Sequence, residues 1–332
     1  MSALLFYISA LLVYFFVNNI LTWGLNIQFG YTGILNFAFI VFVAIGAYIT
    51  GVTSLGRPDP YSGQTYIFGF SWPFPLTLLA GGVAAALFGV LVGFIALKRL
   101  RSDYMAIVTV AVGAISYDFI GNFTPLFNGW DGLGGVPSPL IDTLNLDFAT
   151  YQWFFVALAG VVMLILWWVA HRIYNSPFGR TLRSIREDID VSEAFGKNTF
   201  RYRMIAMVIG CFYAGIAGGL LMEFISAFNP SGWTAGETFV IWAALLIGGR
   251  GNNWGAILGA LLVPVVFQEA TRFLPQFGSA ELIPALRNII VGALLILVLW
   301  FRPQGIIPER KKRFYELPLV AKSKGEPHVA GD

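Results

Sequence analysis

The chain has 332 residues, of which 57% are apolar and 12% are charged, and its mean hydropathy is +0.72. Soluble domains carry about 25% charged residues, so this composition excludes an ordinary soluble domain. The net charge of +3 is too small to indicate a nucleic-acid partner. The single cysteine, Cys211, excludes a disulfide framework within the chain, and its apolar surroundings predict a small packing residue.

Long uncharged segments dominate the sequence from its first residue. No Asp, Glu, Lys or Arg occurs in 1–56, and further uncharged runs cover 148–171, 204–222, 238–249, 251–268 and 288–301. A helix that crosses the hydrocarbon needs about 20 mainly apolar residues. The runs lack the alternation of a membrane β-barrel, which is the other structure that satisfies its backbone in lipid. They predict an all-α fold, a polytopic transmembrane helical bundle in contact with membrane lipid.

We place about nine spans (eight to ten) within a transmembrane domain that covers 1–306. The N-terminal run has neither the basic region nor the cleavage site of a signal peptide, so we expect it to be a retained span. The glycine-rich stretch 23–56 is compatible with a broken or additional helix. The predicted spans are 3–22, 33–51, 74–97, 104–121, 152–171, 204–222, 238–249, 254–274 and 285–301.

The basic residues predict the orientation of the bundle. Of the 21 Lys and Arg residues, 18 lie in 98–101, in 172–203, at Arg250 or after residue 301, all on one face of the predicted topology. By the positive-inside rule this face is cytoplasmic, which places the C-terminus inside the cell membrane and, for nine spans, the N-terminus outside. The opposite loops are predicted to hold acidic residues, namely Asp59, Asp131, Asp142, Asp147, Glu223, Glu237 and Glu281.

Two segments outside the spans carry a prediction of their own. The glycine-rich external loop 122–151 suits either a flexible linker or a folded cap that meets a soluble partner or gates a pore. The polar tail 307–332 is predicted to be disordered.

The cytoplasmic loop 172–203 is patterned. Ser176 suits an N-cap and Pro177 the first helical position, so we predict a helix from Pro177 to Phe195 with Gly196 as the residue after its C-cap. Phe178, Leu182, Ile185 and Ile189 would form its apolar stripe.

Two interpretations of this helix remain open. One is an amphipathic helix at the lipid headgroups. The other is a docking helix for a cytoplasmic motor protein, which is favoured because the loop also carries Glu187, Asp188, Asp190 and Glu193, and anionic headgroups would repel these carboxylates.

The loop sequence SPFGRTLRSIRED at 176–188, continued by AFGKN at 194–198, closely resembles the cytoplasmic signature of LivM-type permeases, the second membrane subunit of branched-chain amino-acid ABC importers. Matching segments lie in family order at 30–37, 102–109, 248–255 and 301–305. Ala38-Phe39 departs from the family's usual Gly or Ala followed by His, which leaves the solute open.

The resemblance implies a heteromeric importer with two ATP-binding cassette ATPase subunits, a second related permease subunit and an extracytoplasmic solute-binding protein. It also implies ABC-importer permease architecture and an ATPase-docking role for Pro177, Phe178, Gly179, Arg180, Leu182, Arg183, Ile185, Arg186, Glu187, Glu193 and Gly196.

The sequence gives little support for catalysis, metal or cofactor binding, or ion-coupled transport. The sequence has no Gly-x-x-x-x-Gly-Lys-Ser/Thr phosphate loop and only two histidines, so we expect no ATP hydrolysis, cofactor, metal or catalytic group in this chain. An ion-coupled carrier would need ionisable groups deep in the membrane, and the candidates are Asp118 and an interfacial Glu269–Arg272 pair.

Polar and aromatic residues within apolar spans are the candidates for the translocation path, although each also suits helix packing. The path candidates are Asn36, Phe37, Thr109, Ser116 and Tyr117, with Asn26 and Gln28 near the first break. The predicted function is an importer permease for branched-chain amino acids. The alternatives are a permease for urea or short amides, a secondary transporter, and a membrane-embedded enzyme.

Overall fold

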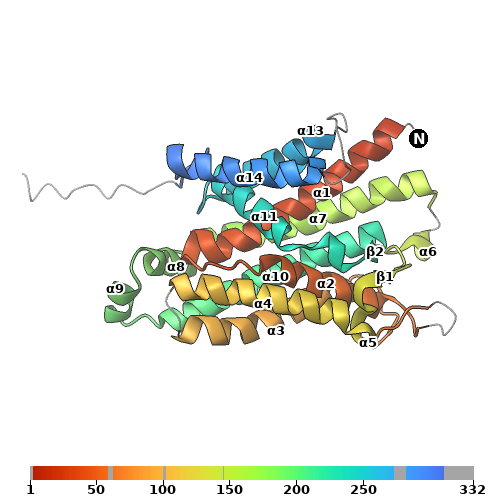
Figure 1. Cartoon of the computed structure of the whole chain (residues 1–332), viewed down its shortest axis with the longest axis horizontal. Helices are drawn as coiled ribbons and strands as arrows, with labels where there is room; N and C mark the ends of the chain where they lie inside the picture. Colours follow the sequence, from red (N-terminus) through yellow and green to blue (C-terminus); the bar gives the residue numbers. More distant parts are fainter. Residues whose placement is uncertain (1–2, 59–62, 100–101, 145, 273–281, 310–332) are drawn as a thin grey trace, which may run out of the picture.

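The computed structural model describes residues 3–58, 63–99, 102–144, 146–272 and 282–309. It is a bundle of long, roughly aligned helices (Figure 1). The N-terminus and the small strands lie at one end, and α8, α9 and the end of α14 lie at the other (Figure 1). The elements are α1 (Ala3–Leu25), the π-helix η1 (Asn26–Gly30), α2 (Phe39–Ser54), α3 (Leu76–Arg99), α4 (Ser102–Asn122), α5 (Thr124–Phe127), the 3-10 turn η2 (Gly129–Asp131), β1 (Leu133–Gly134), α6 (Ile141–Leu144), α7 (Phe148–Asn175), α8 (Pro177–Glu187), α9 (Ile189–Ala194), α10 (Thr199–Ile225), β2 (Ala227–Phe228), the 3-10 turn η3 (Pro230–Gly232), α11 (Ala235–Gly248), α12 (Asn253–Leu261), the π-helix η4 (Leu262–Phe267), α13 (Gln268–Arg272) and α14 (Leu282–Phe301).

The helical class is confirmed, and the count of nine spans is not. Within the described residues six helices are long and apolar enough to cross a membrane, and they begin at Leu4, Leu76, Tyr104, Phe148, Thr199 and Asn253. The predicted spans 33–51 and 238–249 correspond to α2 and α11, which have 16 and 14 residues. Such helices extend about 24 and 21 Å, less than the hydrocarbon thickness of about 30 Å.

Helix α10 packs closely against both α2 and α3, which also pack against each other. Glycines allow this close approach: a Cβ added at Gly218 would overlap the carbonyl oxygen of Val43, and one at Gly46 would overlap that of Gly215. Small residues at helix crossings are the usual means of packing in lipid, where dispersion replaces the hydrophobic effect. Because α2 is enclosed by its neighbours, nearly all its side chains are buried, unlike those of a lipid-facing span.

The first helix is interrupted within the glycine-rich stretch 23–56, where the sequence was compatible with a break. After Leu25 the chain continues as the π-helix η1, passes Gly33 in the left-handed region (φ +72°), and starts α2 at Phe39. Asn26 stabilises this break, because its Oδ1 accepts the Gly251 N–H at 2.9 Å and its Nδ2 donates to Asn253 Oδ1 at 3.2 Å. The break is therefore tied to the α11–α12 turn.

The described residues of this segment, 122–144 and 146–151, are folded, so the flexible-linker interpretation is wrong. Its strand β1 pairs antiparallel with β2, with Leu133 opposite Phe228. The rings of Phe127 and Phe228 pack on Tyr48 of α2, with centroids 4.8 and 5.4 Å away. We name the β1–β2 pair and its flanking turns η2 and η3 the cap.

The described residues on both sides of position 306, where a domain boundary was predicted, contact the bundle. The Ile306 and Ile307 N–H groups donate to the carbonyls of Ile247 and Gly248 at 2.8 and 3.0 Å, and Asn252 Nδ2 donates to the carbonyl of Pro308 at 3.2 Å. Residues 302–309 therefore pack along the α11–α12 turn. The predicted disorder of 310–332 lies outside the described residues.

Candidate functional site

Helix α8 begins as its sequence predicts. Ser176 Oγ accepts the Gly179 N–H at 3.1 Å, and Pro177 follows at the first helical position. Leu182 and Ile185 are fully buried against the bundle. Gly179 fits because a Cβ there would meet the carbonyl oxygens of Ile173 and Tyr174. The helix is thus held at the end of the bundle where the basic loops lie.

The single helix predicted from Pro177 to Phe195 is wrong. The chain breaks at Asp188, which is extended (φ −154°, ψ 117°) and caps α9 by accepting the Val191 N–H on Oδ1 at 2.9 Å. Asp favours caps over helix interiors because its short side chain bonds nearby backbone donors. The apolar stripe consequently ends at Ile185, and Ile189 starts a second short helix.

Gly196 ends α9 as predicted. It has φ +75°, its N–H donates to the Glu193 carbonyl at 2.8 Å, and the Lys197 N–H donates to the Ser192 carbonyl at 3.1 Å. These two bonds make a Schellman motif, whose left-handed position favours glycine. We name α8, α9 and this turn the α8–α9 element.

The surface of the α8–α9 element carries both charged and apolar side chains. Arg180, Glu187 and Glu193 are exposed, and Glu193 also accepts a hydrogen bond from Thr199 Oγ1, which connects the element to the start of α10. Phe195 is 80% exposed and Val191 is 49% exposed. The sequence interpretation did not include these two apolar residues among the docking candidates, although an exposed Phe at a loop tip is a usable signal for a protein contact.

Arg183 and Arg186 point into the bundle. Arg186 donates to the carbonyl of Gly30 in η1 and lies 2.7 Å from Glu309 Oε2. Arg183 Nη1 donates to the Tyr174 carbonyl at 3.3 Å, its guanidinium lies 4.4 Å from the ring centroid of that residue, and its Nε is 3.7 Å from Glu309 Oε1. These two side chains connect the element to the helix break and to residues 302–309.

Two polar path candidates are enclosed by protein. Asn36 is fully buried, where its Nδ2 donates to Gln28 Oε1 at 2.9 Å and its Oδ1 accepts the Ala38 N–H at 3.1 Å. Thr109 Oγ1 accepts the Phe37 N–H at 3.1 Å and donates to the Ala106 carbonyl at 2.9 Å. Both stabilise the segment between η1 and α2, and neither lines either of the two cavities described below.

Phe37 and Tyr117 do come together. They line a cavity of about 350 Å³ between α4 and α11, together with Trp233 and Phe239, which we name the aromatic cavity. Tyr117 packs edge-on against Trp233 with centroids 5.1 Å apart. Ser116 is not among the lining residues. Among the described residues of this lining, Asp118 is the one that carries a charge.

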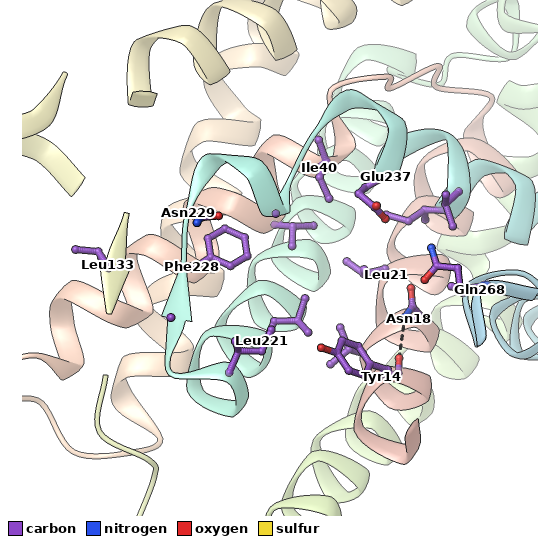
Figure 2. Close-up of a pocket in the computed structure, with 18 of the residues that line it drawn as sticks. Tyr14, Asn18, Leu21, Ile40, Leu133, Leu221, Phe228, Asn229, Glu237 and Gln268 are labelled. Carbon is purple, nitrogen blue, oxygen red and sulfur yellow. Dashed lines mark hydrogen bonds between the residues drawn. The ribbon is translucent and has the colours of Figure 1, made fainter. Parts of the chain in front are cut away.

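A second cavity of about 470 Å³ lies beside the cap, and we name it the cap cavity. Figure 2 shows its two sides: Asn18, Gln268 and Glu237 lie on one, and Leu221 and Phe228 on the other. Its buried walls are aliphatic except for Phe228. The sequence interpretation named none of the residues of this cavity as a site, because α1, α10, α11 and the cap converge here only through the tertiary fold. Ile40 lines this cavity as well as the aromatic cavity.

Comparison with known proteins identifies the family. Residues 7–299 match the family described as branched-chain amino acid transport system / permease component. The chain belongs to this family. It is 30% identical over 313 residues to the high-affinity branched-chain amino acid transport system permease protein LivM of Escherichia coli K12, an alignment that covers 87% of this chain and 67% of LivM.

Two further relatives support the same assignment. LivM of Salmonella typhimurium is 29% identical over 309 residues, with 87% of this chain and 67% of that protein covered. The probable branched-chain amino acid transport permease protein LivM of Methanocaldococcus jannaschii is 29% identical over 333 residues, with 91% and 94% covered. No solved structure matches the chain.

Family membership makes this chain a multi-pass membrane transport permease, in line with its six long apolar helices. One acidic residue then needs a correction. Glu223 was predicted in a loop, but it lies in α10 with 2% exposure, where its Oε1 accepts from Thr77 Oγ1 at 3.1 Å. The predicted Glu269–Arg272 pair involves a side chain outside the described residues. Glu269 accepts a hydrogen bond from the Tyr7 hydroxyl at 2.5 Å.

Proposed function

We propose that this chain is the transmembrane permease subunit of an ABC importer and forms the translocation path for branched-chain amino acids. The observation that carries the proposal is the family match over residues 7–299. This range covers all the long helices apart from the first residues of α1 and the last residues of α14. Separate subunits hydrolyse ATP, because this sequence has no phosphate loop. The other partners are a second related permease and an extracytoplasmic solute-binding protein.

The α8–α9 element is the docking surface for the ATPase. Exposed Phe195 supplies an apolar anchor, while Arg180 and Glu187 add charges of both signs. A protein groove accommodates this mixture better than anionic lipid headgroups do, since these repel carboxylates. The end of the bundle that carries this element and residues 302–309 is therefore cytoplasmic, and the cap is extracytoplasmic.

The path runs beside the segment between η1 and α2. Phe37 and Tyr117 contact the solute or close the path, whereas Asn36 and Thr109 hold the backbone that positions Phe37. ATPase closure moves α8, and Arg186 transmits this movement to η1 through Gly30. Ser116 has a packing role.

The test is reconstitution of the chain in vesicles with the ATPases, the partner permease and the binding protein. We expect uptake of leucine, isoleucine and valine that requires both ATP and the binding protein. Uptake of urea or short amides alone would replace the solute class and keep the importer. Uptake by this chain alone, driven by an ion gradient without ATP, would establish a secondary transporter instead.

A further inference from the structure

The aromatic cavity is lined by both buried and exposed residues. Trp233 and Ile40 are 1% and 8% exposed, whereas Val110 of α4 and Phe239 of α11 are 52% and 47% exposed. Its volume of about 350 Å³ lies at the lower end of the range of small-molecule sites, about 300–1,000 Å³. A small molecule can therefore enter between α4 and α11 and contact buried aromatic and aliphatic groups.

Two rings of this cavity are held in place by contacts with the rest of the chain. Trp233 Nε1 donates to the hydroxyl of Tyr48 at 3.4 Å, and Tyr117 packs edge-on against Trp130 of the cap, with 5.4 Å between the centroids. Side chains that are already ordered lose little freedom when a ligand binds, which favours affinity. The cavity thus presents a preorganised aromatic surface to a solute.

One position of the lining has a glycine that helix packing does not require. A Cβ built at Gly113 of α4 would first meet Ala38, at 3.8 Å, whereas one at Gly218 would overlap the carbonyl oxygen of Val43. Glycine inside a helix costs roughly 0.5–1 kcal/mol relative to alanine, so Gly113 leaves space in the cavity at some loss of stability. The next lining residue, Ala114, is also small. This space suits a branched aliphatic group.

The polar end of the lining is Asp118. Its backbone carbonyl accepts a hydrogen bond from Asn122 Nδ2 at 2.8 Å, but its exposed carboxylate forms no hydrogen bond or ion pair with any described residue. A ligand ammonium would gain a charge-assisted hydrogen bond from this carboxylate. The Tyr117 and Trp233 rings of the same lining would attract it too, since aromatic faces bind cations within about 6 Å of the ring centroid. A positive group beside a branched aliphatic group is the chemistry of a branched-chain amino acid.

We propose that the aromatic cavity binds the transported amino acid inside the permease, with its ammonium beside Asp118 and its branched side chain against Gly113. This inference rests on the proposed import function and adds the residues that select the solute. Asp118 recognises the amino group, and Gly113 sets the largest side chain that fits. The rings of Phe37 and Phe239, with 5.8 Å between their centroids, contact this side chain.

The test uses the complete importer in vesicles with photo-leucine, a diazirine analogue of leucine. On irradiation during ATP-driven uptake, labelled peptides should come from α4 and α11 around Gly113 and Phe239, and excess leucine should suppress the labelling. Gly113→Val should lower leucine uptake roughly tenfold and valine uptake less than about threefold, because valine is one methylene smaller. Each variant is compared with wild type for the same solute, so the selectivity of the binding protein cancels from the ratio.

A second set of variants tests Asp118. Asp118→Asn should lower leucine uptake and photo-leucine labelling roughly tenfold, because it removes one charge-assisted hydrogen bond, and Asp118→Glu should restore most of both. Two controls should behave as wild type. Asp147→Asn removes the same charge from an exposed residue outside the lining, and Gly292→Val adds the same side chain where a Cβ meets no atom within 4 Å. Copurification of the ATPase checks that each variant assembles.

The outcomes separate this site from the proposed function. Failure of wild-type uptake would overturn the proposed function. Normal uptake with labelling confined to other segments would overturn this site alone, as would full activity of both Gly113→Val and Asp118→Asn. Equal defects of Asp118→Asn and Asp118→Glu would exclude recognition of the amino group by charge, and equal defects for leucine and valine in Gly113→Val would exclude the size limit.

Discussion

Arg186 and Glu309 form an ion pair of 2.7 Å although 123 positions separate them in the chain. The same guanidinium donates to the carbonyl of Gly30, at the end of the π-helix that interrupts the first span. One side chain therefore joins the α8–α9 element, the segment after α14 and the helix break. This junction connects the proposed docking surface to the segment that carries Phe37.

The first prediction concerns this junction. Arg186→Ala should lower leucine uptake per ATP hydrolysed roughly three- to thirtyfold, in the range of coupling free energies carried by contact networks. Both partners are only about one-fifth exposed, so the variant leaves the mostly buried Glu309 carboxylate without its closest partner at a cost of about 1–3 kcal/mol, and copurification of the ATPase checks that the importer still assembles. The measurement is uptake and ATP hydrolysis in the same vesicles.

Glu309→Gln is the matched variant for this junction. It keeps a hydrogen-bond acceptor for Arg186 and leaves the bond to Gly30 intact, so its effect on coupling should be smaller than that of Arg186→Ala. An unchanged ratio of uptake to hydrolysis in Arg186→Ala would contradict transmission through this side chain.

The second prediction concerns Gly196. Its φ of +75° strains other L-residues by about 1–2 kcal/mol, and β-branched ones most. A Cβ at this position would meet no atom within 4 Å, so the effect of a substitution is conformational rather than steric. Gly196→Val should unfold the end of α9 and abolish copurification with the ATPase. Gly196→Asn should preserve it, since Asn tolerates the left-handed region. Equal behaviour of the two variants would exclude the Schellman turn as the basis of docking.

Local patterns predicted several elements of the structure. Uncharged runs indicated the long helices, Ser176-Pro177 indicated the start of α8, and Gly196 the end of α9. Each of these signals depends on residues within a few positions of one another. The break at Asp188 was missed because its role as a cap competes locally with a strong apolar periodicity that favours a continuous helix.

Long-range contacts account for what the sequence could not predict. The inward direction of Arg183 and Arg186 depends on Glu309 and Gly30, which lie far away in the chain. Apolar composition marked α2 as a membrane span, but it does not distinguish lipid from protein as the surroundings of a helix. The cap cavity likewise joins residues of α1, α2, α10, α11, η4, α13 and the cap, and no local motif marks these positions.

The third prediction tests the glycine crossing at the centre of the bundle. Gly218→Val would place side-chain atoms on the carbonyl of Val43 and force α10 away from α2. We expect a loss of about 1–3 kcal/mol in stability, the usual range for overpacking, together with a lower thermal midpoint of the purified protein. Gly292→Ala is the control, because a Cβ at Gly292 meets no atom within 4 Å. A midpoint unchanged in Gly218→Val would show that the crossing tolerates separation.

The fourth prediction separates two neighbouring path candidates. Tyr117 lines the aromatic cavity and packs edge-on against Trp130 and Trp233, with centroids 5.4 and 5.1 Å away, whereas Ser116 lies outside the lining. Tyr117→Ala should reduce uptake roughly tenfold, because it removes two aromatic contacts that shape the cavity. Ser116→Ala, one position away, should leave uptake within twofold of wild type, since exposed or half-buried sites without specific contacts tolerate small changes of about 0.5 kcal/mol.

The comparison requires equal amounts of assembled importer, measured by copurification of the ATPase. A larger defect in Ser116→Ala than in Tyr117→Ala would place the path on the other face of α4 and remove the aromatic cavity from it.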